Sequence, residues 1–266
     1  LVLQGETLWI SYYSSHEGKT SIYLAKADMS PSGSHNDNRT GRQKGSYAEK
    51  GTPQHVTDIS TRRELFVDDH LIETLQGAAQ RVLQHPAPQE ICLERNRPWE
   101  GNTCSYTTVF QDGDLYRMYY RGSNVVYTEG KAEPTHPDVT CYAESKDGLN
   151  WTRPNLGLVA FEGSTKNNIV WDGVGCHNFT PFRDPHPDCD PAAKYKALGR
   201  GKLPEPVNGS KHGLYALQSA DGIHWELMCG EPVITQGAFD SQNLAFRDPL
   251  RGVYRAYFRD FREKER

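Results

Sequence analysis

The sequence reads YRMYYRG at residues 116–122, YKALGRG at 195–201 and YRAYFRD at 254–260, so one short pattern recurs three times. Each copy begins with tyrosine and follows a second strand-like segment and a tight turn. The preceding segments are SYTTVFQDGDL (105–115), NFTPFRDPHPDCDPAAK (178–194) and NLAFRDPLRGV (243–253). Asp-Gly and Asp-Pro pairs form tight turns, so each copy predicts a β-hairpin.

A third strand follows each of the first two hairpins and ends in the motif S-x-D-G-x-x-W. The two copies are YAESKDGLNW at 142–151 and YALQSADGIHW at 215–225. Tandem units of about four strands, separated by glycine-rich turns, are typical of β-propeller blades. We therefore predict an all-β fold, a β-propeller of four-stranded antiparallel blades, with an irregular β-sandwich as the alternative.

The strand pattern divides the chain into three parts. Residues 1–29 predict a β-hairpin, which could supply last-blade strands of a preceding propeller or of the same one. Residues 30–61 are rich in Gly, Pro, Asn and charged residues, and predict a flexible linker. Residues 62–266 hold about three blades where a closed propeller has at least four, so we expect an incomplete propeller domain and a fragment of a longer protein.

Composition excludes several classes of protein. The 30 Lys and Arg against 34 Asp and Glu give a net charge of −4, which leaves no basic surplus for binding nucleic acid. No apolar run is long enough for a membrane helix, so no membrane partner is expected. The six cysteines form no C-x-x-C pair and are expected mostly as buried free thiols. Localisation is undetermined, with a periplasmic or secreted location favoured over a cytoplasmic one.

Three features resemble the five-bladed β-propeller glycoside hydrolases of families 32 and 43 and their uncharacterised bacterial relatives, over residues 62–266. They are the FRDP motifs at 182–185 and 246–249, the paired S-x-D-G-x-x-W turns, and RPWEGN at 97–102. The resemblance implies an enzyme that hydrolyses glycosidic bonds, with a carbohydrate substrate as its partner. It implies no cofactor beyond a structural Ca²⁺ in the central channel, for which the sequence identifies no ligands.

In family 32, an Arg-Asp-Pro motif supplies an aspartate that stabilises the transition state, so the resemblance makes Asp184 a catalytic candidate. The repeat favours a structural role instead, because Asp112 and Asp248 occupy the same turn in the other copies. An aspartate before Pro or Gly hydrogen-bonds the local backbone without any catalytic function. The sequence also lacks a clear W-M-N-D-P-N motif and a Glu-Cys acid motif, which family 32 enzymes carry.

The residues that vary between copies are better candidates for a site. In a propeller, the starts of first strands and the ends of second strands lie on one face, and one substrate presents different atoms to each blade. That face is expected to hold Glu100, Asn102, Arg121, His177, Asn178, Arg200, Asp240, Asn243, Arg259 and Asp260.

Glycoside cleavage requires two carboxyl groups on either side of one bond. Glu100, beside Trp99, is expected as the acid, and Asp240 as the base or nucleophile. Trp99 is a candidate stacking platform for a sugar, and Arg121, Arg200 and Arg259 are candidates to clamp an anionic sugar. No metal site is expected. Two alternatives stay open: a propeller that binds carbohydrate or acts as a scaffold without catalysis, and a glycoside phosphorylase.

Overall fold

The computed structural model describes residues 2–4, 7–14, 21–28, 68–82, 85–103, 105–203 and 211–260, the first three ranges as backbone strands. The predicted linker 30–61 lies outside these residues. The described part of the chain is built from antiparallel strands and contains no α-helix, which confirms the all-β prediction. No helix within it has the length and apolar character that crossing a bilayer requires.

The first sheet joins the start of the chain to the segment that follows the linker. Its strands lie in the order β1 (Val2–Gln4), β2 (Thr7–Ser14), β3 (Ser21–Asp28) and β4 (Ala87–Glu94). β2 and β3 form the predicted hairpin, in register from Thr7 opposite Asp28 to Ser14 opposite Ser21. The hairpin therefore shares a sheet with a strand more than fifty residues further along the chain.

The second and third sheets are the four-stranded repeats that the sequence pattern predicts. The second sheet contains β5 (Thr108–Asp112), β6 (Leu115–Gly122), β9 (Val139–Ser145) and β10 (Ile169–Trp171), in that order. The third contains β11 (Thr180–Arg183), β12 (Tyr195–Gly201), β13 (Gly213–Ser219) and β14 (Glu226–Leu227). β6 and β12 are the first two copies of the repeated segment, each paired with the strand before it.

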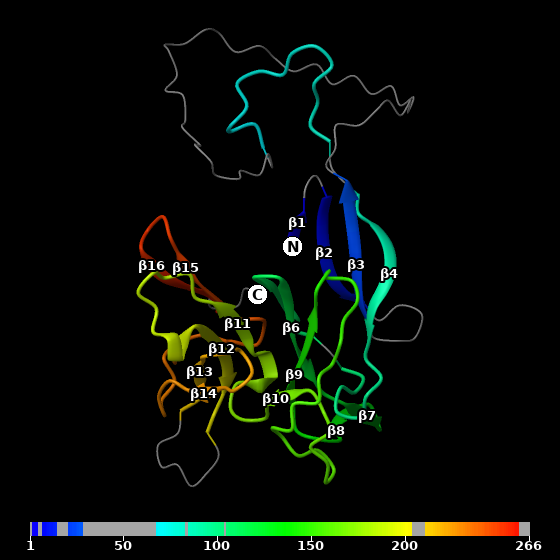
Figure 1. Cartoon of the computed structure of the whole chain (residues 1–266), viewed down its shortest axis with the longest axis vertical. Coiled ribbons are helices and arrows are strands. Elements are labelled where there is room, and N and C mark those ends of the chain that lie inside the picture. Colours follow the sequence, from blue (N-terminus) through cyan, green and yellow to red (C-terminus); the bar gives the residue numbers. More distant parts are fainter. Residues whose placement is uncertain are drawn as a thin grey trace.

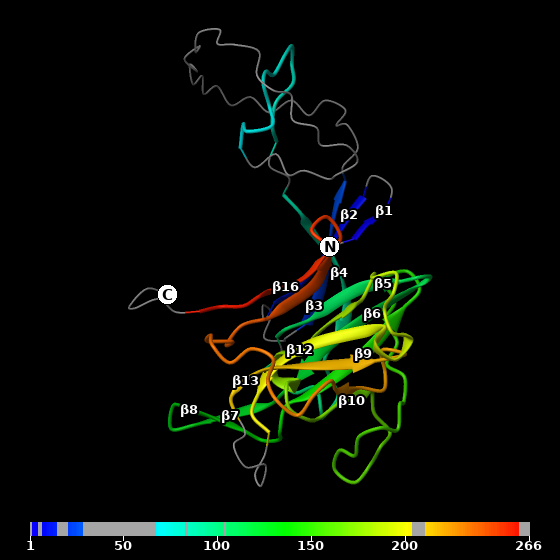
Figure 2. The same ribbon diagram turned by 90° about the vertical axis from the view of Figure 1, so that its left-hand side faces the viewer.

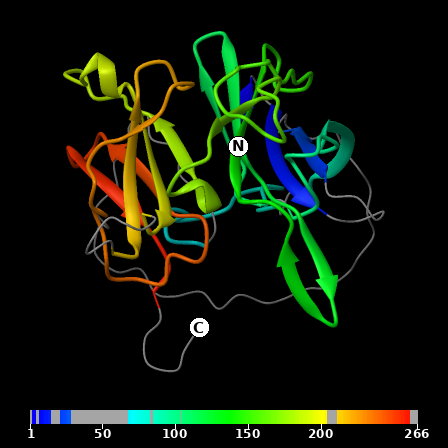
Figure 3. The same cartoon turned by 90° about the horizontal axis from the view of Figure 1, so that it is seen from below.

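Two shorter hairpins and two single-turn 3₁₀ helices complete the described structure. β15 (Leu244–Asp248) pairs with β16 (Val253–Tyr257), which holds the third copy of the repeat. β7 (Val125–Thr128) and β8 (Lys131–Pro134) form a hairpin that projects from the rest of the molecule (Figures 2 and 3). The 3₁₀ helices are η2 (Cys176–Asn178) and η3 (Pro191–Ala193).

The sheets follow one another in chain order and stack face to face (Figures 1 and 3). Successive side chains of a strand point to opposite faces, so β6 contributes to two cores. Met118 and Tyr120 pack in a cluster that includes Leu93 of β4. Tyr119 packs on the other face, against Tyr195 and neighbouring residues of the third sheet. The first strands β5 and β11 also lie in contact, as do β11 and β15.

The turn aspartates connect neighbouring sheets. Asp112 Oδ2 accepts hydrogen bonds from Arg117 Nε (2.7 Å) and from the Tyr195 hydroxyl of the third sheet (2.5 Å). Asp184 Oδ2 accepts in the same way from Lys196 Nζ and from the Tyr254 hydroxyl of β16, both at 2.5 Å. We call this recurring pair of a turn aspartate and the next sheet's tyrosine the latch.

The S-x-D-G-x-x-W motifs form two matching turns. In the first, Asp147 Oδ1 accepts from the backbone N–H groups of Leu149 and Asn150, and Asp221 Oδ1 does the same in the second. Side-chain hydrogen bonds from Asn150 to Asp147 and from His224 to Asp221 add to these contacts. Together they hold the pKa values of both aspartates below their usual range, against the opposing effect of burial. Gly222 has φ +80°, and a Cβ there would lie 2.8 Å from the Tyr119 hydroxyl, so the turn requires glycine. Both aspartates are structural, as the repeat predicted.

Candidate functional site

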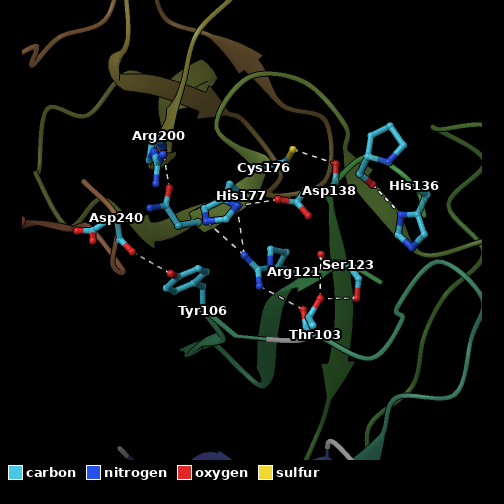
Figure 4. Close-up of polar contacts among 12 residues, drawn as sticks. Thr103, Tyr106, Arg121, Ser123, His136, Asp138, Cys176, His177, Arg200 and Asp240 are labelled. Atoms are coloured by element: carbon cyan, nitrogen blue, oxygen red, sulfur yellow. Dashed lines mark hydrogen bonds and ion pairs between the residues drawn. The ribbon is translucent and has the colours of Figure 1, made fainter. Parts of the chain in front are cut away.

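One end of the stacked sheets gathers residues that differ between the repeats. Each antiparallel hairpin places the start of its first strand beside the end of its second, as the pairing of Thr108 with Tyr119 and of Leu244 with Tyr257 illustrates. We call this end the rim. Its polar residues are Tyr106, Arg121, Asp138, His177, Arg200, His212, Asp240 and Arg259, several of which Figure 4 shows.

Arg121, His177 and Asp138 form a compact charged cluster at the rim (Figure 4). His177 Nδ1 lies 2.7 Å from Asp138 Oδ2, and Arg121 Nη1 lies 3.2 Å from the same nitrogen. Arg121 Nη2 also donates to the backbone carbonyl of Thr103. Burial raises the pKa of Asp138, but hydrogen bonds from His177 and Ser123 and the charge of Arg121 outweigh it, so the pKa lies below its usual range. Asp138 is therefore ionised at neutral pH and orients the imidazole.

Tyr106 connects this cluster to Asp240. Its ring lies 5.6 Å from the His177 ring and 5.1 Å from the Arg121 guanidinium carbon, and its hydroxyl donates to the Asp240 carbonyl at 3.1 Å. The backbone of Tyr106 has φ +60°, and Phe239, beside Asp240, has φ +54°. Left-handed backbone in bulky residues is costly, and such strain clusters at functional sites.

Asp240 carries the more exposed rim carboxylate. Arg259 contacts it through two nitrogens, Nε to Oδ1 at 2.7 Å and Nη2 to Oδ2 at 2.5 Å. This two-point contact with Arg259 holds the pKa of Asp240 below its usual range. About a third of the Asp240 side chain stays exposed, 37%. Asp240 is thus an ionised carboxylate that solvent reaches.

Two buried asparagines position the rim rather than contact a ligand. The Asn178 amide donates to the carbonyls of Phe239 (2.9 Å) and Ser241 (2.7 Å), and its oxygen accepts from the backbone N–H of Arg200. Asn243 donates to the same two carbonyls. Both side chains have no exposed surface, which corrects the expectation that they bind substrate.

Arg200 lies near the end of β12. Its Nε donates to His212 Nε2 at 3.1 Å. Partial burial and the charge of Arg200 lower the pKa of His212, so this imidazole is neutral at neutral pH. The structure therefore brings five of the candidate residues to the same end of the sheets: Arg121, His177, Arg200, Asp240 and Arg259.

The expectation that Glu100 acts as a catalytic acid is corrected. The side chain has no exposed surface. Its Oε1 accepts from the Tyr120 hydroxyl at 2.6 Å and pairs with Arg153, and its Oε2 accepts from the backbone N–H groups of Asn96 and Arg97. Both oxygens thus have partners in the interior, where the carboxylate has no contact with solvent.

Asp184 and Trp99 are corrected for similar reasons. Asp184 follows β11 at the end opposite His177, where its latch contacts lower its pKa to about 2 against the opposing effect of burial. Trp99 is half-buried, donates to Asn168 Oδ1 and packs edge-on against Phe161, so it is part of the core. Asn102 is tied to the backbone of Val125. Asp260 is exposed beside Arg259.

Two rim residues were not among the predicted candidates. They would have been found by also considering the residues that directly precede the third strand of each sheet. Asp138 directly precedes β9 and His212 directly precedes β13. Tyr106 carries no sequence signal, because its importance comes from its backbone conformation and its contacts.

Neither cysteine chemistry nor a metal centre is evident in the ranges the structure describes. Those ranges contain no group of three or more His, Cys, Asp or Glu side chains that could hold an ion. The five described cysteines are free, but of these Cys141 alone is fully buried, which corrects the expectation for the rest. Burial and the charges of Asp138 and Asp172 raise the pKa of Cys176 to about 12, so this thiol at the rim is unreactive.

Comparison with known proteins gives distant similarities. No family model matches the sequence. Two curated proteins, the uncharacterized proteins Rv1502 and MT1551 of two Mycobacterium tuberculosis strains, are each 30% identical over 135 residues, 51% of this chain and 36% of theirs. The match thus spans little more than a third of the length of these relatives.

Solved structures show a similar pattern. A glycosyl hydrolase from Bacteroides ovatus is 14% identical with a TM-score of 0.44, covering 93% of this chain and 56% of its own. A structure described under "The GH130 family of mannoside phosphorylases contains glycoside hydrolases that target beta-1,2 mannosidic linkages in Candida mannan" is 14% identical with a TM-score of 0.43, over the same shares. Likenesses this weak carry no functional conclusion for this chain.

Proposed function

We propose that the protein binds an oligosaccharide or polysaccharide across the rim and cleaves a glycosidic bond there. The proposal depends on one observation: a repeated scaffold ends in a set of residues that is not repeated. Two carboxylates, two histidines and three arginines gather at that end beside the half-buried ring of Tyr106. An asymmetric ligand such as a sugar requires different contacts from each repeat.

The rim residues supply the proton transfers that hydrolysis requires. Asp240, ionised by its contact with Arg259, takes a proton from the water that attacks the anomeric carbon. His177, held by Asp138, gives its proton to the leaving oxygen as the bond between that oxygen and the anomeric carbon breaks. Tyr106 lies between the two groups, where its ring can stack on a sugar.

The scaffold itself belongs to the same proposal. We assign the stacked sheets as blades of a five-bladed propeller, as the resemblance to families 32 and 43 implies. The face-to-face stacking and the contacts between successive first strands support this assignment. An open groove of about 330 Å³ is lined by residues of β5 and β11 and their surroundings, among them Phe110, Pro181 and Phe182, and we assign it to the channel of this propeller.

A second candidate function is carbohydrate binding without cleavage. It is favoured by one observation. Both rim carboxylates, Asp138 beside His177 and Asp240 beside Arg259, have lowered pKa values, so neither resembles the protonated acid that glycosidases use. The two candidates differ in whether His177 can take the place of that acid.

The test is turnover of a panel of aryl glycosides and polysaccharides by the full chain, with and without phosphate. Asp240→Asn and His177→Gln should each lower kcat/KM about 100-fold or more, as expected for loss of a proton-transferring group. Asp114→Asn, an exposed turn aspartate at the opposite end of the sheets, is the matched control and should leave turnover unchanged. Saccharide binding without turnover would instead identify a binding protein, and dependence on phosphate would identify phosphorolysis at the rim arginines.

A further inference from the structure

Arg95 is a buried arginine that forms no ion pair with any residue that the structure describes. It directly follows β4, and the residue is only 8% exposed. One nitrogen, Nη2, donates to Thr107 Oγ1 at 2.9 Å, and the guanidinium lies 4.9 Å from the centre of the Tyr120 ring. The other two nitrogens, Nε and Nη1, have no hydrogen-bond acceptor among the residues that the structure describes.

The neighbouring carboxylates already have other partners. Glu100 pairs with Arg153, and Asp138 is shared by His177 and Arg121. Burial lowers the pKa of Arg95 to about 10, so it keeps its charge at neutral pH. The charge of Glu100 also acts on Arg95, but no described carboxylate forms an ion pair with Arg95 itself. A buried charge without a partner is strongly unfavourable, and proteins tolerate such costs mainly at functional sites.

The position of Arg95 connects this charge to the rim. Thr107, its hydrogen-bond partner, follows Tyr106 in the chain. Thr107 is also contacted by Gln242, which lies two residues beyond Asp240. Arg121 is near enough for its charge to act on the pKa of Arg95. Arg95 thus lies directly behind the rim, and the Thr107 hydroxyl, which accepts from Arg95, still has a proton to donate.

We propose that Arg95 and Thr107 bind the carboxylate of an acidic sugar, which makes Arg95 the residue that selects a uronate over a neutral sugar. A single guanidinium without an ion pair to any described residue matches a monoanion such as a carboxylate better than doubly charged phosphate. Free guanidinium nitrogens and a hydroxyl are the donors that a carboxylate requires. This inference rests on the proposed function, since it names the class of sugar that the same rim accepts.

The test is the thermal stability of the full chain with sodium glucuronate or galacturonate, compared with glucose and with sodium chloride at equal ionic strength. A ligand that binds the folded state raises Tm. The uronates should raise Tm and glucose should not. Arg95→Met should abolish this shift while leaving the ligand-free protein as stable as the parent or more stable, because it removes a buried unpaired charge. Arg97→Met, an exposed arginine two residues away, is the matched control and should keep the shift.

Three results would overturn the proposal: no uronate shift in the parent, a shift that persists in Arg95→Met, or a shift with sodium phosphate but not with the uronates. If Arg95→Met does not fold, the proposal is tested with Arg95→Lys instead. It keeps the charge but loses the planar donors, and should weaken the Kd for glucuronate about tenfold, whereas an unchanged Kd contradicts the proposal. Uronate binding without turnover would contradict the proposed glycosidic cleavage but not the role of Arg95. Turnover of neutral glycosides without uronate binding would contradict the role of Arg95 but not the cleavage.

Discussion

At the scale of single residues, Asn178 shows how a buried amide can control a site from beneath it. Asn178→Ala removes three hydrogen bonds that connect η2, β12 and the loop carrying Asp240. Because buried backbone groups lose their partners, the free energy of unfolding should fall by about 1–3 kcal/mol, measured by urea denaturation. Asn155→Ala, at an exposed position, should change it little. Equal stability of the two variants would contradict the positioning role.

Glu100 and His177 show which residue roles could be predicted from the sequence. The place of His177 follows from its position before a first strand, which any antiparallel repeat fixes. The place of Glu100 depends on Tyr120 and Arg153, which lie 20 and 53 residues away and carry no motif. In a sequence, a glutamate beside a tryptophan is compatible with both an active-site acid and a buried ion pair. The two roles can be distinguished only once the fold shows which distant residues contact the carboxylate.

At the scale of elements, the latch should account for a measurable part of the stability between sheets. Tyr195→Phe and Asp112→Asn each remove the hydroxyl to carboxylate hydrogen bond between the second and third sheets. Each should lower the free energy of unfolding by about 1–3 kcal/mol, and the double variant should lose less than the sum. Tyr127→Phe on the projecting hairpin, where the side chain is 74% exposed, serves as the control. Strict additivity of the two losses would contradict a direct latch.

The hairpins themselves could be predicted because their signals are local. Alternating strands around Asp-Gly or Asp-Pro turns specify β5–β6, β11–β12 and β15–β16 from adjacent residues. The repeat also identified the turn aspartates as structural. The partners of the latch could not be predicted, since Tyr195 and Tyr254 lie 83 and 70 residues from their aspartates. The pairing of β3 with β4 across the linker was equally beyond a local pattern.

At the scale of the whole molecule, the aspartates of the turns and the rim predict how stability depends on pH. Their pKa values are lowered in the folded protein, and at the buried Asp184 the pKa falls from 3.8 to about 2. A lowered pKa means that the unfolded chain binds protons more readily. The stabilisation is therefore complete above about pH 4 and is lost as the pH falls towards 2.

The magnitude of this effect follows from the size of the shift. A shift of nearly two pKa units at the buried Asp184 corresponds to about 2 kcal/mol. Urea denaturation should give a constant free energy of unfolding between about pH 5 and 7 and a steep decline below pH 4. Asp184→Asn should be less stable at neutral pH and should lose less on acidification, because its amide does not titrate. An unfolding free energy that stays level down to pH 2 would mean that the carboxylates connecting the sheets contribute no net stability to the stack.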